Sequence, residues 1–252
     1  MRKLAGCVFC LVLLTALAAR ADTLVKFDDK VGSYGASSWT FDGLITANAY
    51  YLNTTTNTWQ AANLFGRNEA NDHGIGVCDP AETNCGSGSG QGDINELDNA
   101  GKKELIRLTL PAGYKWVSVQ LSSLDKNSSS LPSQWERGLL ATDSTGSPGG
   151  PLTTICTFAP DSGGTCAVVG GTAWTASSSF EPILGNLGAD ASDQYLFFKP
   201  YDWTTGHYNT NNDYLIAAAT IKAPPVPEPA SMLLLGSGLV TIASVVRRKR
   251  RS

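Results

Sequence analysis

The chain has few of the residues and motifs on which common enzyme classes depend. Only two histidines occur in 252 residues, and charged residues make up 16% of the chain. The motifs Gly-x-Ser-x-Gly and His-Glu-x-x-His are both absent. The sequence therefore contains neither the nucleophile motif of α/β-hydrolases nor the zinc-binding motif of metalloproteases. Acidic pairs are present, but no pair stands out as a glycosidase dyad. We therefore expect a protein that is not an enzyme, and keep a secreted enzyme acting on polysaccharide as the alternative.

Two further absences constrain the architecture. No unit repeats with a period of 20–50 residues, which argues against a solenoid or propeller. Helical apolar periodicity is scarce, whereas short β-rich runs separated by Gly, Pro and Asn turns are frequent. This pattern predicts a single all-β domain, a β-sandwich or jelly roll. The expected strands cover residues 23–27, 39–47, 104–110, 115–121, 137–142, 153–158, 165–169, 194–199 and 214–222.

Two of these runs alternate clearly between apolar and polar residues. In the first, Ile106, Leu108 and Leu110 should share one face of the sheet. In the second, residues 117, 119 and 121 should do the same. Pro, Ala and Gly at 111–113 separate the two runs, and we interpret them as a hairpin connection.

Residues 1–21 have the features of a secretory signal peptide. Arg2 and Lys3 precede an apolar stretch over 4–19, and Ala19-Arg20-Ala21 fits a cleavage site between small residues. The mature chain should therefore begin at Asp22 and contain one passenger domain over 22–222.

The C-terminal segment, 223–252, contains three successive features. A proline-rich hinge carries Pro227, Glu228 and Pro229, and an apolar stretch of about 230–246 follows it. A full membrane span needs about 20 residues, so this stretch predicts a short transmembrane helix. The chain then ends in a basic cluster that should stay on the cytoplasmic side. This cluster consists of Arg247, Arg248, Lys249, Arg250 and Arg251.

The order and spacing of these three features resemble the PEP-CTERM sorting signal of Gram-negative bacteria. The resemblance implies that an exosortase recognises Pro227, Glu228 and Pro229 and removes the tail, after an intermediate anchored in the inner membrane. It also implies delivery to the cell surface or extracellular matrix, with exopolysaccharide and biofilm material as the associated partners. The alternative is an ordinary C-terminal membrane anchor.

Removing both ends makes the passenger acidic. The signal peptide contains three basic residues and the tail five, which leaves 11 of the 19 in the chain. About 21 of the 22 acidic residues remain, so the passenger has a net charge near −10. An acidic exterior argues against nucleic acid or anionic lipid as a partner.

Four cysteines remain in the passenger, and an even number in an exported chain favours disulfides. Four cysteines allow three pairings. We favour Cys78 with Cys85 and Cys156 with Cys166, because each pair brackets a turn-rich stretch. Closing each short loop should contribute on the order of 2–3 kcal/mol. Zinc is the competing explanation, but these spacings do not fit the usual Cys-x-x-Cys pairs.

The residue types indicate two candidate binding sites. Asp93, Asn95 and Asp98 offer the oxygen ligands that calcium prefers, although the alternative is a solvated turn whose side chains cap backbone groups. No other cofactor is expected. Tyr201, Trp203 and Tyr208 lie in a polar, aromatic loop before the last expected strand. They are the candidate contacts with a glycan, and burial in the β core is the commoner use of such residues.

Overall fold

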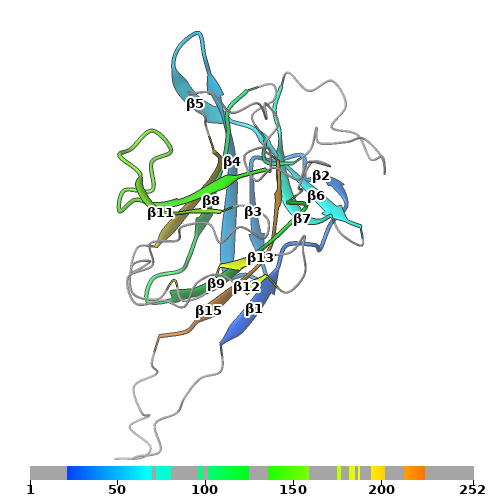
Figure 1. Cartoon of the computed structure of the whole chain (residues 1–252), viewed down its shortest axis with the longest axis vertical. Coiled ribbons are helices and arrows are strands. Elements are labelled where there is room, and N and C mark those ends of the chain that lie inside the picture. The colour runs from blue at the N-terminus through cyan, green and yellow to red at the C-terminus, as the bar shows by residue number, and fades with distance from the viewer. Residues whose placement is uncertain are drawn as a thin grey trace, which may run out of the picture. The chain divides into compact units, whose positions relative to one another are not determined.

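Strands are the only regular elements in the described residues of this computed structural model. The structure describes residues 22–69, 72–80, 96–98, 102–124, 136–158, 175–176, 182–184, 187, 194–201 and 213–224. Asp22–Ala223 form one compact unit. The strands within the described part of the chain are β1 (Thr23–Lys26), β2 (Gly32–Ser33), β3 (Ser38–Phe41), β4 (Ile45–Asn53), β5 (Thr58–Ala61), β6 (Asn63–Asn68), β7 (His73–Cys78), β8 (Glu104–Thr109), β9 (Lys115–Ser122), β10 (Gly138–Thr142), β11 (Thr153–Phe158), β12 (Thr175–Ala176), β13 (Pro182–Leu184), β14 (Tyr195–Pro200) and β15 (Leu215–Lys222) (Figure 1).

The first sheet is organised around its last strand, β15. Its strand order among the described residues is β12-β13-β9-β15-β7-β6-β2, and β1 also pairs with β15. One edge of β15 pairs with β9 along its length, while the other is shared between β7 at Ile216 and β1 at 218–221. Since β15 joins β9 to β7 and β1, the sheet is complete only when this C-terminal strand is in place.

The second sheet has the order β11-β10-β14-β8-β4-β3, with β5 also paired to β4. Its long strand β4 pairs with β8 on one edge, and β3 and β5 share the other edge. The turn between β4 and β5 lies at the upper end of the domain in Figure 1, whereas β1 begins and β15 ends at the lower end.

Residues from both sheets form one apolar core. Alternate residues of β4 from Ile45 to Tyr51 are buried, because alternate side chains of a strand point to the same face. The predicted shared face of Ile106, Leu108 and Leu110 is confirmed, since all three belong to this core. An all-β arrangement of two sheets with a common core is consistent with a β-sandwich.

Three local predictions were wrong. The residues at 111–113 do not form a hairpin, because β8 lies in the second sheet and β9 in the first. The single strand expected over 39–47 is a hairpin of β3 and β4, whose turn contains Asp42 and Gly43 at positive φ. The third wrong prediction concerns β9: Val117 was expected to face the core, but Trp116 is the residue that is buried there. A bulge causes this change, because Ser118 pairs with Thr220 but Trp116 pairs with Ile221, which leaves Val117 without an opposite residue.

Several expected features lie outside the described residues. These are the strand over 165–169, the signal peptide over 1–21 and the transmembrane helix over 230–246. Within the described ranges, no helix is long and apolar enough to span a membrane. The sequence pattern does not predict β2, β5, β6, β7, β12 or β13, because these strands are short or contain glycine and polar residues.

Candidate functional site

The two ends of the passenger domain meet side by side. Thr23 at the start of β1 pairs with Ile221 near the end of β15, and Lys222 pairs with Lys115 at the start of β9. We call this the β1–β15 end, defined by Thr23, Leu24, Lys115 and Lys222. The described chain continues only to residue 224, so Pro227, Glu228, Pro229 and the basic cluster at 247–251 lie outside it.

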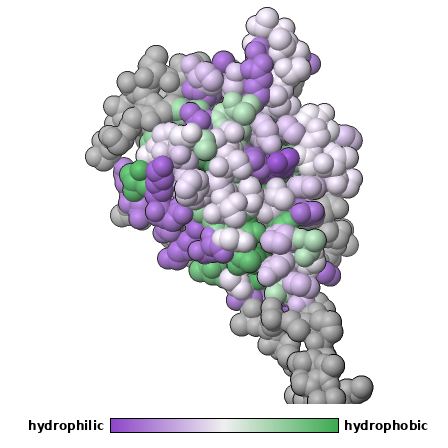
Figure 2. Space-filling view, turned by 180° about the vertical axis from the view of Figure 1, so that it is seen from behind, coloured by the Kyte–Doolittle hydropathy of each residue, from purple (hydrophilic) through white to green (hydrophobic). Residues whose placement is uncertain are grey.

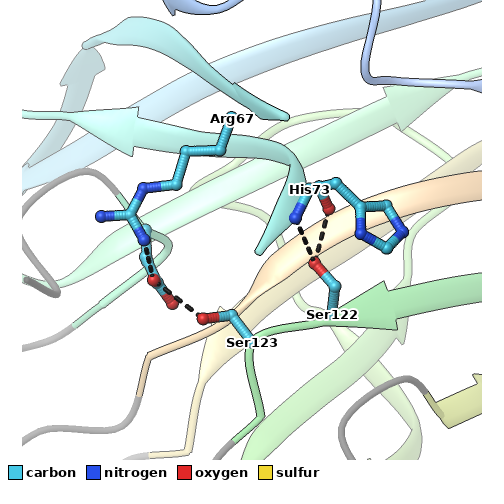
Figure 3. Close-up of polar contacts among 5 residues, drawn as sticks. Arg67, His73, Ser122 and Ser123 are labelled. Atoms are coloured by element: carbon cyan, nitrogen blue, oxygen red, sulfur yellow. Dashed lines mark hydrogen bonds and ion pairs between the residues drawn. The ribbon is translucent and has the colours of Figure 1, made fainter. Parts of the chain in front are cut away.

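A buried ion pair lies near the start of β7 (Figure 3). Arg67 of β6 donates from Nη1 to Oε1 of Glu96, and the Ser123 hydroxyl donates to the same oxygen at 2.8 Å. Glu96 is 3% exposed, and its Oε2 has no hydrogen-bond partner. Sequence reasoning missed this pair, although an arginine after the apolar residues of β6 is a signal for a buried partner.

Burial raises the pKa of the Glu96 carboxyl well above its usual range, and the negative charges of Asp213 and Asp72 raise it further. Arg67 and the Ser123 hydroxyl lower the same pKa, but their effect is smaller. The backbone around Glu96 is held on both sides, since the Val77 N–H donates to its carbonyl and the Leu97 N–H donates to the Tyr214 carbonyl. The geometry is that of a structural group inside the fold.

A serine hydroxyl links β9 to the start of β7 beside this ion pair. The Ser122 hydroxyl accepts a hydrogen bond from the His73 N–H at 3.2 Å and donates to the His73 carbonyl (Figure 3). Both contacts use the backbone of His73 and do not involve its imidazole.

The outer face of the second sheet carries a cluster around Arg107 of β8. Its guanidinium donates to Asn48 Oδ1 at 2.9 Å and to the Gly146 carbonyl. The same group lies 5.7 Å from the ring centre of Tyr50 and 5.6 Å from that of Tyr195. These contacts attach the loop after β10 to the sheet, and they leave both rings half-buried.

An exposed aromatic residue lies at the edge strand β3. Trp39 is 40% exposed, its ring centre is 5.2 Å from that of Tyr34, and the Lys30 ammonium lies 5.9 Å from the Trp39 ring centre. Among the predicted glycan contacts, Tyr201 is half-buried after β14, and its N–H donates to the Arg137 carbonyl at 2.9 Å. Trp203 and Tyr208 lie outside the described residues.

The predicted calcium ligands are only partly described. Asp98 is 3% exposed, and its N–H donates to Glu104 Oε2 at 2.9 Å. Asp93 and Asn95 lie outside the described residues. Within the part of the chain that the structure describes, no three His, Cys, Asp or Glu residues are placed to hold a metal ion. The calcium site stays a prediction.

Cys78 ends β7 and Cys156 lies in β11, and both are disulfide-bonded. Their predicted partners, Cys85 and Cys166, lie outside the described residues, so the pairing stays a prediction.

Comparison with known protein families identifies the PEP-CTERM protein-sorting motif over residues 225–251. Searches of curated proteins and of solved structures found no match to the chain. The matched segment begins three residues after β15 ends at Lys222 and includes the Pro227-Glu228-Pro229 hinge, the apolar stretch and the basic cluster. The motif implies processing by an exosortase and an exported, membrane-anchored intermediate before that step. The chain is therefore a protein with a C-terminal PEP-CTERM sorting motif.

Proposed function

We propose that this chain is an exported surface protein whose tail is removed by an exosortase and whose passenger has a structural or glycan-binding role in exopolysaccharide or biofilm. The observation that carries the proposal is the position of the sorting motif at 225–251, directly after the last strand of the passenger. A folded domain that ends at the motif leaves the proline-rich hinge outside the sheets, where a processing enzyme can reach it.

The two termini would act in sequence. The signal peptide at 1–21 starts export, and the short apolar helix at 230–246 stops transfer of the chain. The basic residues at 247–251 stay on the cytoplasmic side. Proline cannot continue a central strand or a helix, so the hinge at Pro227, Glu228 and Pro229 stays extended on the outer side of the inner membrane. Removal of the tail then sends the passenger to the cell surface or matrix of a Gram-negative bacterium.

The passenger would bind or support polysaccharide without catalysing a reaction. Glu96 itself is poorly placed to act on a substrate, because its carboxyl is 3% exposed and paired with Arg67. The exposed ring of Trp39 and the half-buried ring of Tyr201 are aromatic surfaces of the kind that stack on sugars. The secreted enzyme acting on polysaccharide remains the alternative function.

Intact-mass analysis of protein released from the cells tests the sorting step. We expect the released protein to lack the residues after the motif, and replacement of Pro227, Glu228 and Pro229 by alanine should leave the full-length chain in the inner membrane. If the parent protein keeps the basic residues at 247–251, the chain is an ordinary anchored protein.

A glycan array with the released protein tests the role of the passenger. Binding should weaken for Trp39→Ala or for a variant with alanine at Tyr201, Trp203 and Tyr208. An array without signal for the parent protein would leave only the structural role. Release of reducing sugar ends from polysaccharide would instead favour the enzyme.

A further inference from the structure

The chain offers very little length between the folded sheet and the sorting motif. β15 ends at Lys222, and the matched motif starts at 225, so only residues 223–224 belong to neither. Nine residues, 223–231, separate β15 from the apolar residue Met232. At no more than about 3.3–3.6 Å per residue, these nine residues span at most roughly 30 Å.

This distance is short compared with the domain itself. A compact unit of about 200 residues has a radius of gyration of roughly 16 Å, and hence a diameter of about 40 Å. While the apolar stretch is in the membrane, the β1–β15 end must therefore stay close to the membrane surface. The turn between β4 and β5 lies at the opposite end of the domain (Figure 1).

Pairing prevents β15 from lengthening this connection. The strand is paired to β9 on one edge and to β7 and β1 on the other, and six of its eight residues are buried. Pulling β15 out would expose Ile216 and Ile221, both fully buried, and would separate β9 from β7. The reach of the motif can therefore increase only if the first sheet unfolds.

The surface of the β1–β15 end fits a membrane-embedded partner. Leu24 is 53% exposed, and Lys115 and Lys222 are exposed. On the face seen in Figure 2, apolar residues gather toward the lower end of the domain, where β1 begins and β15 ends.

We propose that the β1–β15 end is the surface of the passenger that faces the membrane-embedded processing enzyme, and that the pairing of β15 sets the distance at which the sorting motif is presented. This inference rests on the proposed removal of the tail by an exosortase. It adds that residues 223–224, outside the matched motif, determine processing, and that they do so only while the passenger is folded.

Pulse–chase measurement of tail removal from the full-length chain in its native host tests this dependence. Deletion of residues 223–224 should slow cleavage at least fivefold, because the folded domain then blocks access to the motif. Insertion of Gly-Ser after Pro224 is the matched control and should leave the rate within twofold. Protease resistance of the passenger would show that both variants are folded.

The same deletion is then made in Ile216→Asp, where a buried charge prevents β15 from joining the sheet. The deletion should now change the cleavage rate by less than twofold, measured as the cleaved fraction of the surviving chain. An equal slowing in both backgrounds, or no slowing in the folded one, would overturn the inference. Replacement of Pro227, Glu228 and Pro229 by alanine separates the two proposals, because cleavage of that variant at the parental rate contradicts exosortase processing itself.

Site-specific photo-cross-linking of the parent chain during the pulse, before the tail is removed, supplies an independent readout. A photoreactive phenylalanine at Leu24 should cross-link to the exosortase, and cross-linking to lipid alone would contradict contact with the enzyme. The same probe at the exposed Thr56, in the turn between β4 and β5, should not. Equal cross-linking at the two positions would contradict the proposed orientation.

Discussion

Gly74 is the position at which one added methyl group should most directly disturb the packing of β15 in the first sheet. Gly74 lies in β7 with φ +127°, a backbone conformation that L side chains rarely adopt. A Cβ atom there would lie 2.3 Å from the Ile216 carbonyl oxygen and 2.8 Å from the Ala217 Cα, and both belong to the β15 backbone. A backbone that is paired on both edges cannot move aside cheaply, so Gly74→Ala should strain both strands.

The expected loss follows from two effects. A residue held at an unfavourable φ costs of order 1–3 kcal/mol. Overpacking against the β15 backbone costs typically 1–3 kcal/mol more. The sum of about 2–6 kcal/mol is a large share of the roughly 5–15 kcal/mol by which domains are stable. For a domain of this size, the midpoint of thermal unfolding should fall by roughly 5–20 °C.

Urea denaturation and thermal melting of a chain spanning residues 22–224 would measure this loss. Gly149→Ala is the matched control, because its Cβ would meet only Trp59 Cδ1, at an ordinary 3.8 Å. It should be neutral, or stabilising by about 0.4–1 kcal/mol through the unfolded state. A Gly74→Ala variant whose unfolding free energy stays within about 1 kcal/mol of the parent would refute the reasoning about β15.

Four further measurements test the buried Glu96, the Arg107 cluster, the disulfides and the acidic cluster. The raised pKa of Glu96 means that the folded state holds this proton more tightly than the unfolded chain, whose Glu pKa is about 4.3. The parent should therefore lose unfolding free energy relative to Glu96→Gln as pH rises from about 4, and a difference that does not change with pH would contradict this. Arg107→Met should lower the free energy of unfolding, measured by urea denaturation, by about 2–4 kcal/mol, because it removes two charged hydrogen bonds and two ring contacts. Arg107→Lys should lower it by about 1–2 kcal/mol. Equal stability of Arg107→Lys and the parent would contradict the role of the planar guanidinium group. Non-reducing peptide mapping should find the two predicted local disulfides, and a link between the two pairs would exclude them. Thermal melting with millimolar calcium should shift to higher temperature, less so for Asp98→Ala, and a parent that melts identically with chelator has no such site.

Local sequence determined which segments become strands more reliably than it determined their partners. The alternation in β8 placed Ile106, Leu108 and Leu110 correctly, because a period of two follows from the geometry of an isolated strand. The same rule failed in β9, where a bulge between the pairs with Thr220 and Ile221 places Trp116 instead of Val117 on the core face. A bulge arises from the pairing of two strands, so the sequence of one strand contains no direct sign of it.

Local sequence patterns also did not predict which charged residues are buried. Residues around 93–99 suggested a solvated or calcium-binding turn, yet Glu96 and Asp98 are buried. The reason is that Arg67, distant in sequence, supplies the opposite charge for Glu96. Burial of a charge depends on a partner, and only the fold brings that partner close.

The sequence by itself determined the sorting motif, because such a motif is recognised as a linear segment of the chain. The PEP-CTERM motif at 225–251 can be read without any knowledge of the passenger. Only the tertiary structure decided what the motif is attached to. The strand that leads into it, β15, is held by β9, β7 and β1 from three distant parts of the chain. The residue at which the sheet ends, and so the number of residues before the motif, therefore depends on long-range strand pairing, which local sequence patterns do not reveal.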